Sequence, residues 1–210
     1  MEPNADAGRA RFDAAVAAHL SAPLAGGIAL RHVTGPELLA VNERLWGEAA
    51  RAPFGALDRM YTEEQRQRVA DLGAVLGTPL SHRVLLLDGE EVVGCYWGQQ
   101  SVLGRYHMVS TIVAPAYQGR GIYREVLERV VAAVRDSGFT EIHSWHRADN
   151  NAVLVPKLRA GFLIMGFEVT TRFGVLVQLR RYLVENVELL HRYRVDGSFA
   201  EQLRSRGVVG

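Results

Sequence analysis

The stretch Val113-Ala114-Pro115-Ala116-Tyr117-Gln118-Gly119-Arg120-Gly121-Ile122-Tyr123 joins an apolar run to a long amphipathic segment. The apolar run, residues 108–113, predicts a strand that the proline ends, and apolar residues at helical spacing after the turn predict a helix. Glycines lack a Cβ, so the backbone there can tighten and approach a ligand closely. The first amides of a helix have no partner within it, and the helix dipole makes that end positive. The sequence therefore predicts a phosphate-binding turn at residues 118–123.

The other predicted elements place this turn in an α/β fold with a mixed, mostly antiparallel sheet. Three consecutive antiparallel strands precede the turn, and helix and strand alternate after it, which favours helices on both faces of the sheet. The Asp88-Gly89 pair predicts a two-residue hairpin turn. Thr62 and Ser198 each precede a Gln or Glu by three residues and so predict helix starts. We expect strands at residues 28–33, 82–87, 92–97, 105–113, 140–146, 163–170 and 173–179.

The composition fits one domain of moderate size. The chain has 210 residues and a formal net charge of +1. We expect an N-terminal helix and loop at residues 1–26, a main domain at 27–182, and a helical tail at 183–210 packed on the same domain. Capture of nucleic acid needs a basic surface, and acidic residues are interspersed among the arginines of the tail. Nucleic acid is therefore not an expected partner.

Cysteine usage and hydropathy argue against several other classes. Cys95 is the only cysteine, so no internal disulfide and no multi-cysteine metal site is possible, and the histidines show no metal-ligand spacing. A reducing, cytoplasmic location fits this usage. No run approaches the ~18 apolar residues that span a bilayer. Charged residues also interrupt the N-terminal segment, so neither a membrane contact nor a signal peptide is expected.

A second block of sequence restricts the class of phosphate-containing ligand that this turn is expected to bind. It begins at Asn150 and ends at Gly161-Phe162, with apolar residues at helical spacing between them. Together, the block and the turn resemble the GNAT superfamily of N-acyltransferases, whose pyrophosphate motif reads Gln/Arg-x-x-Gly-x-Gly/Ala. The motif starts here at Gln118, and Tyr123 stands at its sixth position in place of Gly or Ala. The resemblance covers residues 28–180.

The resemblance implies a cofactor, a splayed sheet and a reaction. The cofactor is acetyl-CoA or another acyl-CoA, and its pantetheine arm lies between the 105–113 and 140–146 strands, hydrogen-bonded by Asn150. A main-chain N–H near Val113 polarises the thioester carbonyl. A primary amine, small-molecule or peptide, attacks the thioester directly, and a homodimer is a family-level expectation. The residues implied to bind the cofactor are Ile112, Val113, Gln118, Gly119, Arg120, Gly121, Ile122, Tyr123 and Asn150.

The second block departs from the family at two positions. Lys157, the only lysine, stands where a tyrosine often protonates the leaving thiolate. Its ammonium could stabilise a thiolate, or it could be a solvated residue of the helix. Pro156 removes a helical hydrogen bond and predicts a helix that starts late or is kinked. Tyr123 is likewise either a proton donor to the thiolate or a packing residue.

Histidine chemistry offers a candidate for the general base. His146 lies nearest the C-terminal end of the 140–146 strand, and its ordinary pKa suits proton transfer, although strand histidines are more often structural. Trp145 is expected to pack on a helix. Alternation along the 105–113 strand places Tyr106 and Ser110 on one face. That strand lacks the glutamate that serves some members of the family as base, so an ordered water is an alternative.

Two questions about function stay open at this point. The acceptor is expected to meet the helices at residues 35–72, where Trp46, Phe54, Met60 and Tyr61 favour a small or apolar acceptor. The missing tyrosine, the missing glutamate and the proline also allow a different function. That alternative is a non-catalytic acyl-CoA-binding or regulatory module of the same fold.

Overall fold

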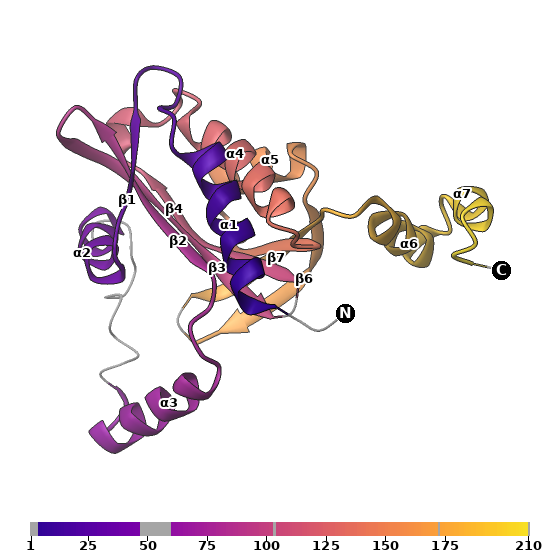
Figure 1. Ribbon diagram of the computed structural model, residues 1–210, viewed down its shortest axis with the longest axis horizontal. Helices are drawn as coiled ribbons and strands as arrows, with labels where there is room; N and C mark the ends of the chain where they lie inside the picture. Colours follow the sequence, from indigo (N-terminus) through magenta and orange to yellow (C-terminus); the bar gives the residue numbers. More distant parts are fainter. Residues whose placement is uncertain (1–3, 47–59, 103, 172, 210) are drawn as a thin grey trace.

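The strands of the computed structural model, which describes residues 4–46, 60–102, 104–171 and 173–209, form one mixed sheet (Figure 1). Their order across the sheet is β1-β2-β3-β4-β5-β7-β6, and every neighbouring pair except β4 and β5 is antiparallel. All the predicted strands are found. They span Ala29–His32 (β1), Ser81–Asp88 (β2), Glu91–Val102 (β3), Arg105–Val113 (β4), Glu141–Arg147 (β5), Leu163–Thr170 (β6) and Gly174–Tyr182 (β7).

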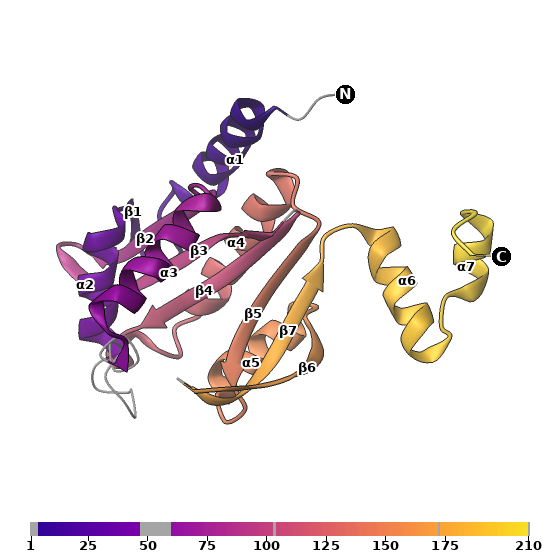
Figure 2. The same cartoon turned by 90° about the horizontal axis from the view of Figure 1, so that it is seen from below.

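The sheet divides between its two central strands. β4 and β5 run parallel and pair only from Arg105↔Glu141 to His107↔His143, after which they separate (Figure 2). Residues 108–113 therefore present an unpaired edge toward β5 among the described strands. The predicted splay between the central strands is confirmed.

Helices cover both faces of the sheet. They span Ala5–Leu20 (α1), Gly35–Trp46 (α2), Glu63–Val75 (α3), Ile122–Asp136 (α4), Asn151–Arg159 (α5), Glu185–Asp196 (α6) and Ala200–Ser205 (α7). α1, α4 and α5 contribute to the larger cluster of buried side chains on one face. α2 covers the opposite face, where Leu38 packs against Leu85 and Cys95. The expected mixed sheet between helical layers is thus observed.

A β-bulge in β4 reverses the facing of its C-terminal half. Gly98 of β3 pairs with Met108 and Trp97 pairs with Ser110, so Val109 is an extra residue without a partner. Before the bulge, Met108 packs in the larger cluster beneath α4. After it, Ser110 faces α2 instead. The alternation that placed Tyr106 and Ser110 on one face is therefore wrong, because one added residue shifts the period of two by one step.

A buried polar cluster lies beneath α1. The hydroxyls of Tyr96 and Tyr106 are 3.1 Å apart, and that of Tyr106 lies 3.0 Å from Nδ1 of His82. Gly98 makes this contact possible, because a Cβ there would lie 2.1 Å from the Tyr106 hydroxyl and 2.3 Å from that of Tyr96. Burial lowers the pKa of His82 to about 3, so this histidine is neutral at physiological pH.

Several local predictions can be compared with the structure. The capping box at Thr62 is confirmed. The hairpin turn lies one residue later than predicted, because Asp88 still pairs with Glu91. The last helix begins after Phe199, which has φ 65° and makes no side-chain cap bond, so the start predicted from Ser198 is wrong. α5 begins directly after Asn150 and contains Pro156, so of the two predicted alternatives the late start is wrong, and the kink stays a prediction.

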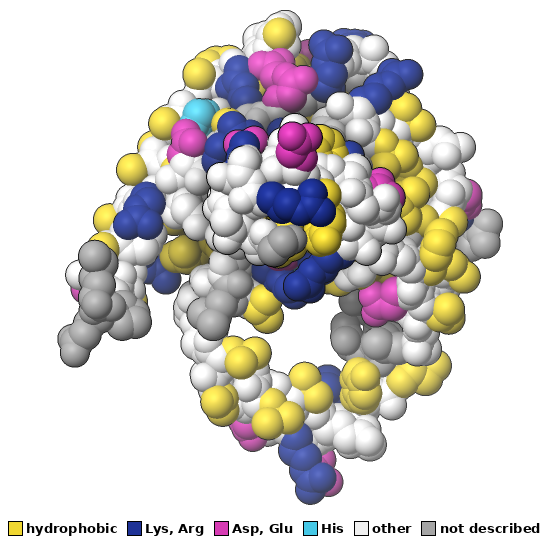
Figure 3. Space-filling view, turned by 90° about the vertical axis from the view of Figure 1, so that its right-hand side faces the viewer, with side chains coloured by type: hydrophobic (Ala, Val, Ile, Leu, Met, Phe, Trp, Pro, Cys, Tyr) yellow, Lys and Arg dark blue, Asp and Glu magenta, His cyan; other side chains and the backbone are white. Residues whose placement is uncertain are grey.

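The C-terminal helices α6 and α7 extend away from the sheet (Figure 1). Their end of the molecule carries acidic and basic side chains side by side (Figure 3). Arg192 pairs with Glu188 at 2.8 Å, and Arg206 pairs with Glu185 at 2.9 Å. Within the described ranges, no helix has the length and apolar character that a bilayer crossing requires.

Candidate active site

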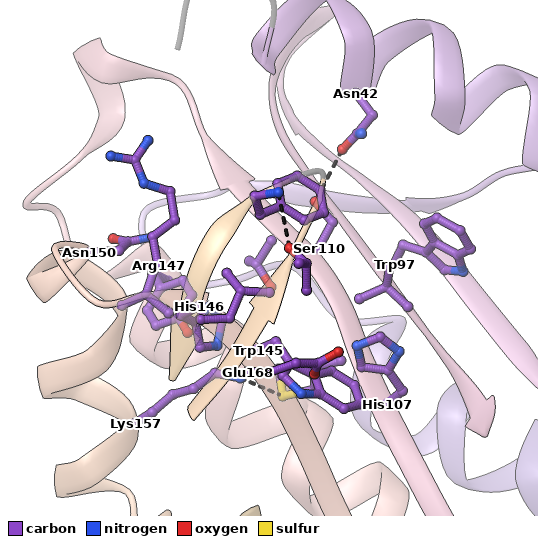
Figure 4. Close-up of a pocket in the computed structure, with 18 of the residues that line it drawn as sticks. Asn42, Trp97, His107, Ser110, Trp145, His146, Arg147, Asn150, Lys157 and Glu168 are labelled. Atoms are coloured by element: carbon purple, nitrogen blue, oxygen red, sulfur yellow. Dashed lines mark hydrogen bonds between the residues drawn. The ribbon is translucent and has the colours of Figure 1, made fainter. Parts of the chain in front are cut away.

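A cavity of about 690 Å³ opens where β4 and β5 separate. It reaches both faces of the sheet, with Asn150, His146 and Lys157 on one side of it and Trp97 and His107 on the other (Figure 4). The walls consist of Leu39, Asn42, Glu43, Trp97, His107, Met108, Val109, Ser110, Thr111, Tyr123, Trp145, His146, Arg147, Asn150, Val153, Lys157, Glu168, Thr170, Phe173 and Leu176.

The glycine turn lies beside this cavity and carries free donors. Gly119 and Gly121 have φ angles of 76° and 82°, in the region that favours glycine, and a Cβ at either would meet open space. The amide of Gln118 donates to the Pro115 carbonyl at 3.2 Å, whereas the amides of residues 119–123 donate to no acceptor among the described residues. Because these amides surround the N-terminus of α4, they suit an anion such as a phosphate.

Surface contacts fix the shape of this turn. Tyr117 donates its hydroxyl proton toward Asp88 at 2.9 Å and lies 3.1 Å from Glu91 of the β2–β3 hairpin. The guanidinium of Arg120 stacks over the Tyr117 ring at 4.5 Å. The arginine is therefore held next to the free amides, where its charge adds to theirs.

Ile112 and Val113, the predicted cofactor-binding residues at the end of β4, differ in the direction of their backbone amides. The amide of Ala114 donates to Val93 on β3 at 2.8 Å. Because successive residues of an antiparallel strand alternate in direction, the amide of Val113 faces the opening and that of Ile112 faces β3. Ile112 does not line the cavity, and its side chain packs against the smaller core cluster beneath α2. Val113 does not line the cavity either, but of these two residues it is the one whose amide points away from β3, toward the gap between β4 and β5.

Lys157 is buried, which overturns the interpretation of a solvated helix residue. Its side chain is 1% exposed, lies 4.8 Å over the Phe162 ring, and forms no ion pair with any described residue. The ammonium donates to the Ser144 hydroxyl at 2.7 Å and contacts Met108 Sδ at 3.4 Å. Burial lowers the pKa of this lysine to about 7, so both protonation states are accessible near neutral pH.

Ser144 connects the lysine with His146. The hydroxyl accepts from Lys157, which leaves its own proton to donate to Nε2 of His146 at 2.9 Å. Burial, followed by the charges of Lys157 and His107, lowers the pKa of His146 to about 2. His146 is therefore a neutral hydrogen-bond acceptor at physiological pH and a weak base.

Tyr123 occupies the second position of α4 and lines the cavity between the turn and α5. Its hydroxyl is buried and has no hydrogen-bond partner among the described residues. Burial raises the pKa of Tyr123 well above its usual value. The group is thus a neutral phenol, and it is available as a donor to whatever fills this side of the cavity.

An aromatic cluster forms the other side of the cavity. The ring of His107 stacks on that of His143 at 5.0 Å and meets Trp145 edge-on at 4.7 Å. Trp145 lines the cavity, so the prediction that it packs on a helix is wrong. Burial lowers the pKa of His107 to about 3 and that of His143 to about 4, with neighbouring cations contributing to both shifts. Neither ring carries a charge at neutral pH.

Several cavity residues escaped the sequence analysis. Asn42 is 1% exposed and accepts from the Ser110 hydroxyl at 3.1 Å. A signal for it existed, because Asn42 is a polar residue within the apolar side of its helix. Ser144 could also have been found, because it lies two residues before His146 on the same strand face. Glu168 lines the cavity from β6; both strands of the β6–β7 hairpin were predicted, but no local pattern indicated that Glu168 would reach the cavity.

The expected acceptor wall is met only in part. α2 lines the cavity through Leu39, Asn42 and Glu43. Met60 and Tyr61 are exposed and do not line it. Phe54 and the side chain of Trp46 lie outside the described residues. No group of three or more potential metal ligands occurs in the described ranges.

The family profile of the GNAT acetyltransferases matches residues 41–162, more than half of the chain. The chain belongs to this family. Among solved structures, its fold is similar to that of three acetyltransferases, each aligned over about three quarters of the chain. No curated protein sequence matches it.

The ribosomal-protein-S18-alanine N-acetyltransferase of Escherichia coli is 17% identical, with a TM-score of 0.52, over 74% of this chain and 94% of that one. The yncA protein of Salmonella typhimurium, solved with acetyl-CoA, is 19% identical, with a TM-score of 0.51, over 75% and 95%. Spermidine N-acetyltransferase of Vibrio cholerae, solved with CoA and spermine, is 14% identical, with a TM-score of 0.51, over 74% and 95%. At these identities the likeness concerns the GNAT fold.

Proposed function

We propose that this GNAT protein is an N-acyltransferase that moves an acetyl or other acyl group from acyl-CoA to a primary amine. The observation that carries the proposal is the row of free amides at residues 119–123, placed beside a cavity that passes through the sheet. A diphosphate supplies the acceptors that these donors lack. Acyl-CoA, when bound, supplies an activated thioester.

Different residues around the opening would bind different parts of acyl-CoA. The turn, with Arg120 beside it, would hold the diphosphate end. Asn150 makes no cap bond to α5, so its amide group is available to the pantetheine arm. Val113 directs its amide into the opening, where it would polarise a carbonyl oxygen. Gln118 supports this edge, because its side chain donates to the Val113 carbonyl at 2.9 Å.

We assign proton transfer to residues of α4, β5 and α5 that line or adjoin the cavity. Lys157 has a pKa near neutrality, which suits a proton donor to a leaving thiolate. Tyr123 is a second donor on the same side of the cavity. His146 is the candidate acceptor of the amine proton, either directly or through water, and Ser144 joins it to Lys157. The amine attacks directly, so no residue needs to act as a nucleophile.

Titration calorimetry with acetyl-CoA, combined with CoA release over a panel of primary amines, tests this function. The only cysteine does not interfere with thiol detection, because Cys95 is 1% exposed and burial raises its pKa to about 12. We expect acetyl-CoA to bind and at least one amine to release CoA. Absence of acetyl-CoA binding by folded protein overturns the proposal.

A non-catalytic acyl-CoA-binding module is the second candidate. It is favoured by the low pKa of His146, which makes this histidine a weak base. Binding of acetyl-CoA without CoA release on any amine, at any pH between 6 and 10, would support this candidate against the enzyme. The homodimer and the cytoplasmic location stay predictions, which sedimentation and cell fractionation test.

A further inference from the structure

The half of the cavity beneath α2 carries two kinds of unpaired polar groups. Glu43 on α2 and Glu168 on β6 line it from opposite walls, and neither carboxylate forms an ion pair or hydrogen bond with a described residue. Three buried donors also lack partners among the described residues: Asn42 Nδ2, Trp97 Nε1 and Trp145 Nε1. Asn42 is 1% exposed and lines the cavity, and its amide nitrogen is buried without a hydrogen-bond partner among the described residues.

The cations near this half are already engaged. Arg147 pairs with Asp149, and Arg105 and Arg180 both pair with Glu141. Arg83 lies over the Trp97 ring at 5.7 Å and does not line the cavity. The lining histidine of this half, His107, is neutral because burial lowers its pKa to about 3. Lys157 lies on the α5 side, bonded to Ser144. The α2 side therefore presents negative charge and neutral donors, without a free cation among the described lining residues.

Complementarity to these groups specifies the acceptor. Two carboxylates favour a ligand with positive charge, and the aromatic rings beside them suit an ammonium group as well. Unpaired neutral donors favour a ligand with neutral oxygen acceptors, such as amide carbonyls or hydroxyls. A free carboxylate on the ligand would meet two like charges and, on the α2 side, no unpaired cation among the described lining residues.

We infer that the acceptor is a cationic amine that carries neutral oxygen acceptors and no free carboxylate. Amino-acid amides and peptide amines have this chemistry, whereas free amino acids do not. The inference rests on the proposed acyltransferase function, and it names the acceptor class of that same cavity.

Three ligands of similar size test separately whether the acceptor needs a neutral oxygen acceptor and whether a free carboxylate prevents binding. Leucinamide has an ammonium and a neutral carbonyl, leucine has an ammonium and a carboxylate, and 3-methylbutylamine has the ammonium alone. Their binding to the CoA-loaded protein is measured by calorimetry, and their kcat/KM values by CoA release. We expect leucinamide to exceed leucine by about tenfold or more in both readouts, with 3-methylbutylamine between them. The advantage over leucine should shrink as salt rises, because exposed charges are screened.

Variants assign the effect to the named groups. Combining Glu43→Gln with Glu168→Gln should bring leucinamide and leucine to within about threefold of each other. Glu201→Gln on α7 is the matched control, because this exposed glutamate lies outside the cavity, and it should change nothing.

Each outcome decides the inference or the function separately. Equal or tighter binding of leucine, or no binding of leucinamide, overturns the inference whatever the turnover. Preferred binding of leucinamide without CoA release supports the inference about the cavity and counts against the enzyme. Failure of CoA itself to bind counts against the proposed function and removes the basis of the inference.

Discussion

The ammonium of Lys157 donates a 2.7 Å hydrogen bond to the hydroxyl of Ser144, and both side chains are shielded from solvent. A charged lysine is costly to bury, and this one has no carboxylate partner among the described residues. The site therefore holds a lysine that gives up its proton far more easily than a lysine in water. Proton donation to a nearby thiolate is a use to which such a group is suited.

Replacement of this lysine tests its role. We expect Lys157→Met to lower kcat by about 100-fold while acetyl-CoA affinity stays within about threefold, because a general acid contributes to the chemical step and not to binding. Arg159→Met, on the exposed side of the same helix, is the control and should keep full activity. Full turnover by the Lys157→Met variant would remove the lysine from the mechanism.

The serine should set the pH at which the lysine loses its proton. Ser144 accepts from the charged form, so Ser144→Ala should lower the pKa of Lys157 further. The fall of kcat toward high pH would then begin about one unit lower, as expected for the loss of one hydrogen bond to a charged group. Ser137→Ala removes a 2.7 Å bond to Ala133 at the end of α4 and should leave the pH profile unchanged. An unshifted profile in Ser144→Ala contradicts the coupling.

The same lysine makes stability depend on pH. Its pKa is about 7 in the folded chain and 10.5 in the reference state, so the unfolded chain holds the extra proton between these values. The folded state should therefore gain stability as pH rises from 7 to 10, on the order of 2–4 kcal/mol relative to Lys157→Met. Urea unfolding of both proteins at several pH values measures this difference. Parallel pH dependences in the two proteins would mean that the lysine titrates normally.

The glycine turn can be tested with a matched pair. Gly121 has φ 82°, a conformation that asparagine tolerates better than other residues. Aspartate and asparagine have side chains of similar shape, but only aspartate places a negative charge at the predicted diphosphate position. Gly121→Asp should therefore weaken acetyl-CoA binding by about 100-fold. Gly121→Asn should weaken it by no more than about tenfold, because it lacks the charge. Equal acetyl-CoA affinities of the two folded variants would show that the diphosphate does not bind at this turn.

The tyrosine pair beneath α1 predicts a stability effect outside the site. Gly98→Ala places a Cβ 2.1 Å from the Tyr106 hydroxyl, so this hydroxyl and that of Tyr96 must move in a closely packed core. We expect a loss of about 2–4 kcal/mol in the free energy of unfolding. Gly8→Ala in α1, where a Cβ meets nothing within 4 Å, should be neutral or stabilising. A neutral Gly98→Ala would show that the pair relaxes freely.

The order of elements could be predicted because each signal is local. Apolar periodicity identified α4, and the glycines with the preceding proline identified its N-terminal turn. The second block placed Asn150 at the start of α5. These features depend on neighbours in the sequence, so one sequence is enough to read them.

The facing of individual side chains could not be predicted in the same way. Val109 looks like an ordinary strand residue, and its bulge depends on how β4 pairs with β3. The burial of Lys157 depends on Met108, Ser144 and Phe162, which come from three separate segments. Such outcomes are set by packing between distant segments, which a pattern along the chain does not contain.

The short contact between β4 and β5 has a mechanical consequence. Among the described strands, two ladders, one from β1 to β4 and the other of β5, β7 and β6, pair with each other only at residues 105–107 and 141–143. The two halves of the sheet are therefore paired at one end only. We expect a small rotation about the paired end to change the width of the gap between β4 and β5 more than it changes the strand pairing within either half. A ligand bound in the gap with hydrogen bonds to both halves of the sheet would restrict this rotation. Slower amide hydrogen exchange along both facing edges should then accompany its binding.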